Sequence, residues 1–273
     1  MKLLDQYDET FVEGGFDAVA DSYGEVLFLR RAAQALVELA DARPARRMLD
    51  IATGPGTLAM LLAQRSSERE IVGIDVAPAM IAAANARAEQ LGLAHVGFQT
   101  ASALDLPFEE QSFDAVLCSN AIYYMADFDQ ALREWARVLR PGGMLAFSSF
   151  GVGVLEPMSS LFDARIRAHG IVVPQPTPLF RLNTAAACRA LLDRAGLDDI
   201  TIHEPQLGYW VRDETAWWQM LMSTGFQALV AALDPAARAE FEREHLREVR
   251  PHVTDRGLWI DVPVIVAAAT KRV

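Results

Sequence analysis

Between residues 48 and 149 the sequence alternates between short apolar runs and longer segments with apolar residues at helical spacing. The apolar runs predict strands, and the segments between them predict helices at 58–64, 77–91 and 128–139. The predicted strands are 48–52, 70–74, 95–100, 113–118 and 144–149. Strands that alternate with helices at this spacing are joined by right-handed crossovers and pair in parallel. The pattern therefore predicts an α/β fold with a doubly wound, Rossmann-like sheet that is mostly parallel and has helices on both faces.

The rhythm changes after Phe150, where Pro157, Pro174, Pro176 and Pro178 interrupt the chain. Beyond them we expect a helix capped by Thr184 and further helices over 214–233 and 236–249. Apolar runs at 197–203 and 263–270 predict two more strands, which makes a seven-stranded sheet. The helical material before the last strand predicts a lid over the carboxyl edge of the sheet, where ligands bind in such folds.

These elements suggest a single domain with three parts. Residues 1–45, including a helix over 26–42, would form an N-terminal helical cap. Residues 46–150 would form the ligand-binding Rossmann-like core, and residues 151–273 would add substrate-binding lid elements and the remaining strands. The 273 residues, of which 52% are hydrophobic, suffice for one well-buried core.

Charge and cysteine content narrow the possible partners and the compartment. The formal net charge of -11 argues against a nucleic-acid partner, which would require a basic surface. Cys118 and Cys188 are far apart and lack metal-ligand spacing, so we expect a reducing cytoplasm and no metal site. No apolar stretch reaches signal-peptide or bilayer length, which predicts a soluble cytoplasmic protein without membrane contact.

The strongest local signal joins a glycine turn to an acidic residue. Gly54 and Gly56 follow the first strand, which contains Asp50, and lead directly into the first helix. Glycine lets the backbone approach a ligand and adopt conformations that are closed to other residues. Asp75 ends the second strand, where a carboxylate can accept hydrogen bonds from both hydroxyls of a ribose. A tight turn without a ligand would show the same glycines, so the turn is only moderately specific by itself.

Five ordered blocks resemble the class I S-adenosylmethionine-dependent methyltransferases, most closely their ubiquinone/menaquinone-biosynthesis-type (methyltransferase domain 11-like) branch. The blocks are Leu49–Thr57, Val72–Met80, Ala103–Phe108 with its Leu-Pro-Phe, Phe113–Tyr124, and Arg137–Gly143 with the sequence Arg-Val-Leu-Arg-Pro-Gly-Gly. The similarity covers roughly residues 16 to 150 and implies that S-adenosylmethionine is the cofactor and S-adenosylhomocysteine the product. Ala52 and Ala101-Ser102 stand where this family often has Gly and Gly-Asp, so the contact with adenine is less firmly implied than the contact with ribose.

The resemblance also implies where the cofactor would bind. Asp75 would hold the ribose hydroxyls, and Tyr23, in a segment that closes over the cofactor, would approach the methionine carboxylate. The other residues implied to contact the cofactor are Ala52, Thr53, Gly54 and Gly56 at the methionine and ribose, Val76, Met80, Ser102, Ala103 and Leu104 at the adenine, and Cys118, Ser119 and Asn120 near the methionine amino group and the transferable methyl.

The sequence indicates the acceptor site less clearly than the cofactor site. Tyr123 and Tyr124 follow the fourth strand at the reacting edge, and Trp217 and Trp218 lie on a predicted helix. All four are candidates for a substrate pocket, although packed aromatic residues would give the same pattern. Because Trp217 and Trp218 are adjacent, we expect only one of them to face inward. His169 and Tyr124 are candidate catalytic groups, and no general base can be named from the sequence.

The sequence thus predicts methyl transfer to the O, N or C nucleophile of a small, aromatic or apolar molecule by a monomer or homodimer. The cofactor carries an electrophilic methyl, so the enzyme can act largely by orienting the acceptor. Other possibilities stay open: an RNA or protein methyltransferase, a nicotinamide-dependent oxidoreductase, or a protein that binds the cofactor without methylating, such as a cyclase.

Overall fold

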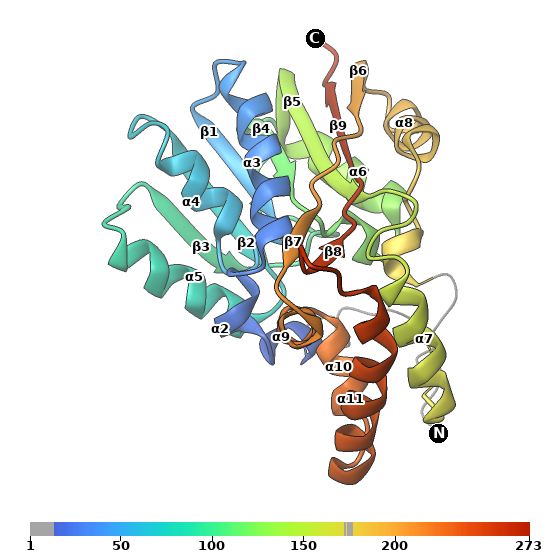
Figure 1. Cartoon of the computed structure of the whole chain (residues 1–273). Coiled ribbons are helices and arrows are strands. Elements are labelled where there is room, and N and C mark those ends of the chain that lie inside the picture. The colour runs from blue at the N-terminus through green and yellow to red at the C-terminus, as the bar shows by residue number, and fades with distance from the viewer. Residues whose placement is uncertain (1–13, 172, 174–176) are drawn as a thin grey trace.

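The computed structural model describes residues 14–171, 173 and 177–273. Seven strands form one sheet in the order β3-β2-β1-β4-β5-β9-β6 (Figure 1). The strands are β1 (Arg47–Ile51), β2 (Glu70–Asp75), β3 (Val96–Thr100), β4 (Phe113–Cys118), β5 (Leu139–Phe150), β6 (Asp198–His203) and β9 (Val264–Thr270). β1 to β5 pair in parallel, and β9 runs antiparallel between β5 and β6. The predicted mostly parallel, seven-stranded Rossmann-like sheet is confirmed.

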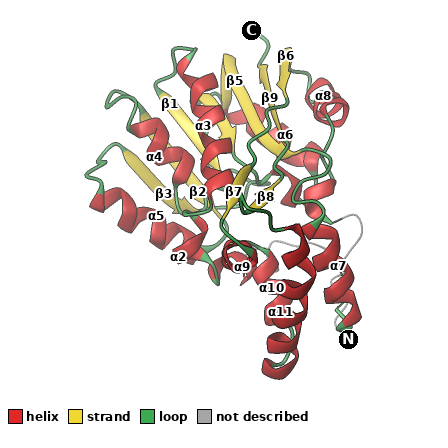
Figure 2. Ribbon diagram, in the orientation of Figure 1, coloured by secondary structure: helices red, strands yellow, loops and turns green. Residues whose placement is uncertain are grey.

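Helices cover both faces of this sheet (Figure 2). On one face lie α3 (Leu27–Asp41), α4 (Thr57–Ala63) and α5 (Pro78–Gln90). On the other lie α6 (Phe128–Val138) and α8 (Ala185–Arg194). Covered on both sides, β1 and β4 are buried along most of their length, as apolar parallel strands must be. The predicted cap of α8 is confirmed, because the Thr184 hydroxyl accepts a hydrogen bond from the Ala187 amide at 3.2 Å.

A second group of helices gathers beyond the carboxyl ends of the parallel strands (Figure 1). It comprises α7 (Met158–Ala168), α9 (Glu214–Met222), α10 (Phe226–Ala231) and α11 (Pro235–Val249). Short elements connect these parts: α2 (Ala20–Tyr23), η1 (Ile122–Tyr124), η2 (Pro178–Phe180), η3 (Arg250–His252), and the hairpin of β7 (Tyr209–Val211) and β8 (Leu258–Ile260). The predicted helical insertion before the last strand is therefore present.

The structure corrects two details of the predicted elements. The single helix expected over 214–233 is two helices, and between them the Thr224 hydroxyl donates to the Leu221 carbonyl at 2.6 Å. The region of changed rhythm after Phe150 contains α7, which the proline residues obscured. Residues 1–13, Pro174 and Pro176 lie outside the described residues. Among the helices that are described, none has both the length and the hydrophobicity needed to span a bilayer.

Candidate functional site

The turn between β1 and α4 is built from left-handed backbone. Ala52, Gly54 and Gly56 have φ angles of 52°, 55° and 80°. Glycine is the residue that adopts such angles at little cost. The Thr53 amide donates to the Ile74 carbonyl of β2 at 2.8 Å, which fixes the turn against the neighbouring strand. The loop therefore presents its backbone at the carboxyl edge of the sheet, as the sequence predicts.

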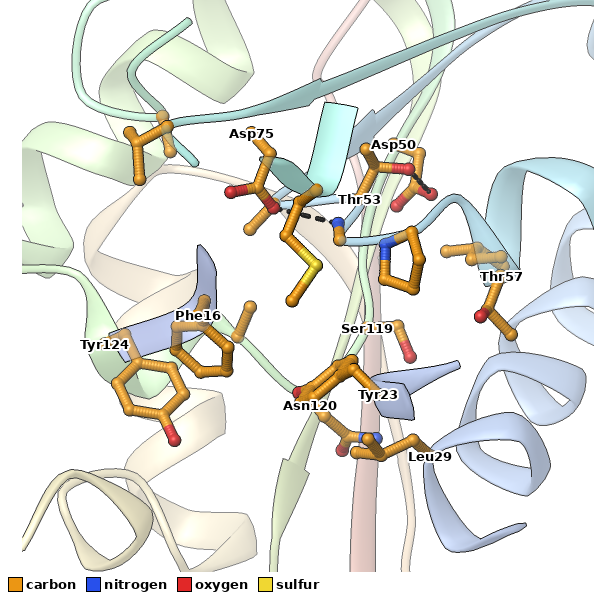
Figure 3. Close-up of a pocket in the computed structure, with 18 of the residues that line it drawn as sticks. Phe16, Tyr23, Leu29, Asp50, Thr53, Thr57, Asp75, Ser119, Asn120 and Tyr124 are labelled. Carbon is orange, nitrogen blue, oxygen red and sulfur yellow. Dashed lines mark hydrogen bonds between the residues drawn. The ribbon is translucent and has the colours of Figure 1, made fainter. Parts of the chain in front are cut away.

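Asp75 is held by backbone donors on both sides of the turn. Its Oδ2 accepts from the Gly54 amide at 2.8 Å, and its Oδ1 accepts from the Ala77 amide at 3.0 Å (Figure 3). Burial raises the pKa of the carboxyl, and these N–H groups oppose that rise. A carboxylate has about four lone-pair sites, so acceptor capacity remains for a ligand beside these backbone donors.

Asp50 lies deeper, at the base of the same turn. Its Oδ2 accepts from the Thr53 hydroxyl at 2.6 Å and from the Ala59 amide at 3.1 Å. Its Oδ1 is buried and has no hydrogen-bond partner among the described residues. Burial raises the pKa of this carboxyl to about 7, despite the two hydrogen bonds. The Asp50 carboxyl, which lies under the turn, therefore gains or loses its negative charge near neutral pH.

A cavity opens over these two carboxylates, and we call it the edge cavity. The residues lining it that the sequence analysis identifies as cofactor contacts are Tyr23, Ala52, Thr53, Gly54, Asp75, Val76, Met80, Ala103, Leu104, Ser119 and Asn120. Segments far apart in the sequence thus converge on one space (Figure 3). Its free volume is about 100 Å³, and Phe16 and Tyr23 from the N-terminal segment line it.

Three predicted cofactor residues do not line the edge cavity. Cys118 is fully buried, and that burial raises its pKa. The Ser102 hydroxyl accepts from the Leu104 amide at 3.1 Å, so it shapes the loop instead. Gly56 faces the protein interior, where an added Cβ would lie 2.8 Å from both the Met60 methyl and the Phe98 ring.

Sequence reasoning missed other lining residues. Asp50, Pro55 and Thr57 lie within the recognised block, so the motif itself could have identified them. Phe16 lies in the N-terminal segment that the resemblance includes. Ala101 and Ala121 also line the cavity and lie at or within recognised sequence blocks. Leu29, Ala33, Leu58, Met125 and Ala126 line it too and carry no sequence signal beyond their apolar character.

A second cavity of about 430 Å³ adjoins the first, and we call it the helical cavity. Phe16 and Tyr124 line both cavities. Their rings meet edge to face, with centroids 5.2 Å apart. Tyr123, by contrast, is buried against Phe150 and lines neither cavity. Of the two tyrosines predicted at the reacting edge, the structure brings only Tyr124 to open space.

The two tryptophans correct the expectation that only one of them faces inward. Trp217 and Trp218 are 0% and 9% exposed, because α9 packs against both α10 and α11. Trp217 donates its indole N–H to His245 at 3.0 Å, and Trp218 packs on Phe241. Neither lines either cavity, so the structure does not place them at the candidate site.

His169 also lies away from both cavities. It follows the end of α7, with its ring 5.6 Å from that of Phe241 and its Nε2 3.8 Å from a Glu244 oxygen. A general base must come within hydrogen-bond reach of the proton it removes, directly or through one water. The structure therefore does not bring this candidate catalytic residue together with the edge cavity.

Residues 48–143 match the family model of a methyltransferase domain. This part of the chain is therefore similar to a methyltransferase domain, and it is the part whose sequence blocks resemble the class I S-adenosylmethionine-dependent methyltransferases of the ubiquinone/menaquinone-biosynthesis type. Outside residues 48–143, two further parts of the chain line the cavities. They are residues 14–47 and the helices that follow β5.

Relatives of known name match about half of the chain. A demethylmenaquinone methyltransferase of Thermus thermophilus is 45% identical over 129 residues, which is 47% of this chain and 57% of that protein. Among solved structures, the YcgJ protein of Bacillus subtilis has a TM-score of 0.60 at 20% identity, over 89% of this chain and 99% of that one. The [4+2]-cyclase SpnF has a TM-score of 0.57 at 23% identity, over 89% and 85% of the two chains. These structures share the fold.

Proposed function

We propose that this protein transfers a methyl group from S-adenosylmethionine to a small, aromatic or apolar molecule. The observation that carries the proposal is the edge cavity, where Asp75 is held by the glycine turn with free lone pairs toward the open space. The sequence similarity to a demethylmenaquinone methyltransferase supports an acceptor of this kind. The residues of the edge cavity also offer the acceptors and the acidic group that suit a cationic nucleoside ligand.

Three features of the edge cavity fit the cofactor. Asp75 offers acceptors for the ribose hydroxyls. A Cβ on Gly54 would lie 3.9 Å from the Tyr23 ring and 4.0 Å from the Met80 sulfur, so the missing side chain keeps this part of the cavity open. The Asp50 carboxyl lies beneath the cavity with an unpartnered Oδ1, and it carries a negative charge when the pH is above its pKa of about 7. When bound, S-adenosylmethionine would supply a methyl group attached to a positively charged sulfur. The acceptor's electron pair would bond to the methyl carbon, and the sulfur would keep the electron pair of the broken S–C bond.

The N-terminal segment would regulate access to this cavity. Its free volume of about 100 Å³ is smaller than the ~300–1,000 Å³ of typical small-molecule sites. Phe16 and Tyr23 pack edge to face at 5.4 Å and narrow it. We therefore propose that these two rings move apart to admit the cofactor and then cover it. Burial raises the pKa of Tyr23, so its hydroxyl stays protonated and can donate to the carboxylate of the methionine moiety.

A cyclase-type function remains the second candidate, because SpnF shares the fold. Calorimetric titration of the protein with S-adenosylmethionine, S-adenosylhomocysteine and NAD tests the cofactor. We expect the first two to bind and NAD to fail. Release of S-adenosylhomocysteine in the presence of aromatic alcohols, amines and quinols then separates the candidates. Cofactor binding without product release for any acceptor would favour the non-methylating protein.

A further inference from the structure

The helical cavity begins where the edge cavity ends. Phe16 and Tyr124 form part of both walls, and no other residue lines both among those described. A molecule in the helical cavity can therefore reach the edge cavity only past these two rings or between them. At about 430 Å³, the helical cavity lies within the ~300–1,000 Å³ that small-molecule sites provide.

The interior of the helical cavity is apolar. Its apolar walls come from α7, the η2 region and α10, and they include Phe162, Val173, Pro178, Leu179, Phe180, Phe226 and Leu229. Phe162 and Phe226 pack edge to face with centroids 5.1 Å apart. Walls of this kind favour ligands that bury apolar area, since each Å² removed from water contributes roughly 25 cal/mol.

The charged side chains that line this cavity already have partners. Arg167 pairs with Asp163 at 2.9 Å and donates to the Val173 carbonyl at 3.2 Å. Glu156 accepts from the Ser160 hydroxyl at 2.8 Å. The formal charge of the described lining is therefore negative by one, and its single arginine is occupied. A carboxylate or phosphate buried here would lack a cationic partner, which is strongly unfavourable.

Gly225 lies at the junction of the two cavities. It lines the helical cavity, and an added Cβ would lie 3.4 Å from the Tyr124 hydroxyl oxygen and 3.7 Å from the Phe16 ring. Its backbone has φ -56° and ψ -16°, which any L-residue can adopt. The turn itself therefore does not require glycine, and what the missing side chain provides is space between the two rings.

From these observations we propose that the helical cavity binds the methyl acceptor, that this acceptor is largely apolar and carries no negative charge, and that it reaches the methyl group over Gly225. The inference rests on the proposed methyltransferase function. It adds the location of the acceptor, its charge class and a residue that limits the size of the group presented to the cofactor.

The charge class is tested with three probes that share one ring system: 2-naphthol, 2-naphthoate and 2-naphthylmethylammonium. Each is titrated into the full chain saturated with S-adenosylhomocysteine. The neutral probe should bind at least about tenfold more tightly than the carboxylate probe, a ratio that corresponds to ~1.4 kcal/mol. Equal or tighter binding of the carboxylate, or no binding of any probe, would overturn the proposal.

The location is tested with Leu229→Trp, which fills the helical cavity, and Gly225→Leu, which obstructs the junction. The matched control is Ala231→Trp, on the exposed side of the same helix. Leu229→Trp should weaken 2-naphthol binding at least about tenfold, while Ala231→Trp should leave it unchanged. Gly225→Leu should slow methyl transfer to the best acceptor found. Thermal melts verify that all three variants fold.

Cofactor affinity distinguishes a failure of the acceptor assignment from a failure of the proposed function. Leu229→Trp and Ala231→Trp should bind S-adenosylmethionine as the wild type does, because neither residue lines the edge cavity. Unaltered 2-naphthol binding in a folded Leu229→Trp protein would remove the acceptor assignment and leave the cofactor site intact. If the wild type bound 2-naphthol but no S-adenosylmethionine, the proposed function would fail and the ligand class of the helical cavity would stand.

Discussion

The Asp75 carboxylate joins the end of β2 to the glycine turn after β1 by accepting the Gly54 amide at 2.8 Å. The same carboxylate accepts the Ala77 amide through its other oxygen. A residue that the sequence indicates as a ribose ligand is therefore also a structural clamp. Its substitution should affect both cofactor binding and the stability of the turn.

Asp75→Asn should weaken S-adenosylmethionine binding at least about tenfold. An asparagine amide has only one acceptor atom, so its NH₂ group would face one of the two backbone N–H donors. An unsatisfied buried donor costs ~1–3 kcal/mol, which should also lower the melting temperature. The measurement is calorimetric titration beside a thermal melt. Asp17→Asn is the matched control, because Asp17 accepts the Ala79 amide at 3.0 Å nearby but does not line the edge cavity. Cofactor binding of normal strength in Asp75→Asn would rule out the ribose assignment.

The elements around this clamp could be predicted because their signals are local. Strand β4, for example, was predicted with the bounds that the structure gives, since an apolar run between turns needs no distant information. Likewise, Gly54 and Asp75 mark the cofactor half of the site by residue type alone. The exceptions are Ser102, whose hydroxyl is used by its own loop, and Gly56 and Cys118, which face the protein interior.

The acceptor half could not be predicted, because it depends on long-range packing. Nothing local distinguishes Tyr124, which lines two cavities, from Tyr123, which is buried beside it. Trp217 and Trp218 are both buried because α9 has neighbours on two sides, a fact of tertiary structure that helical periodicity does not contain. Gly225 looks like an ordinary helix breaker until Phe16 and Tyr124 are seen on either side of it.

Gly56→Ala should destabilise the fold more than Gly92→Ala does. Both glycines have positive φ, 80° and 66°, so both substitutions pay for a left-handed alanine, about 1–2 kcal/mol. Only at Gly56 would the new Cβ also lie 2.8 Å from Met60 and Phe98, whereas Gly92 has nothing within 4 Å. The difference between the two unfolding free energies in urea isolates the packing cost. Equal losses would show that Gly56 is required for backbone angle alone.

Asp50 should make cofactor binding pH-dependent. Its pKa is raised to about 7 by burial, so the carboxylate loses its charge as the pH falls through neutrality. Binding of a cationic ligand should therefore weaken between about pH 8 and about pH 6. In Asp50→Asn the affinity should be lower at pH 8 and the dependence much flatter. Because asparagine can keep the oxygen that accepts from Thr53 and Ala59, the variant should still fold. Protonation of the cofactor itself affects both proteins equally, so Asp50→Asn also serves as the reference for that effect. Parallel pH profiles of affinity in the wild type and Asp50→Asn would exclude Asp50 as the source of the pH dependence.

His245 should make the stability of the helical region depend on pH. Its Nε2 accepts the Trp217 indole N–H at 3.0 Å, while its Nδ1 is buried without a partner among the described residues. Burial lowers the pKa of this imidazole from 6.5 to about 4, against the opposing influence of Glu248 and with a smaller contribution from Arg165 in the same direction as burial. Between about pH 6.5 and pH 4, His245 is therefore protonated in the unfolded chain and neutral in the folded chain.

The stability contributed by neutral His245 is complete above about pH 6.5 and is lost as the pH falls toward 4, by up to about 3 kcal/mol. The readout is the melting temperature across this range for wild type and His245→Gln, whose amide oxygen can still accept from Trp217. The variant should show the shallower slope, because glutamine has no imidazole to protonate. His169→Gln, which replaces the partly exposed histidine beside Glu244, is the control for replacing a histidine in this region. A His245→Gln profile that tracks the wild type would show that this imidazole is not the source of the pH dependence.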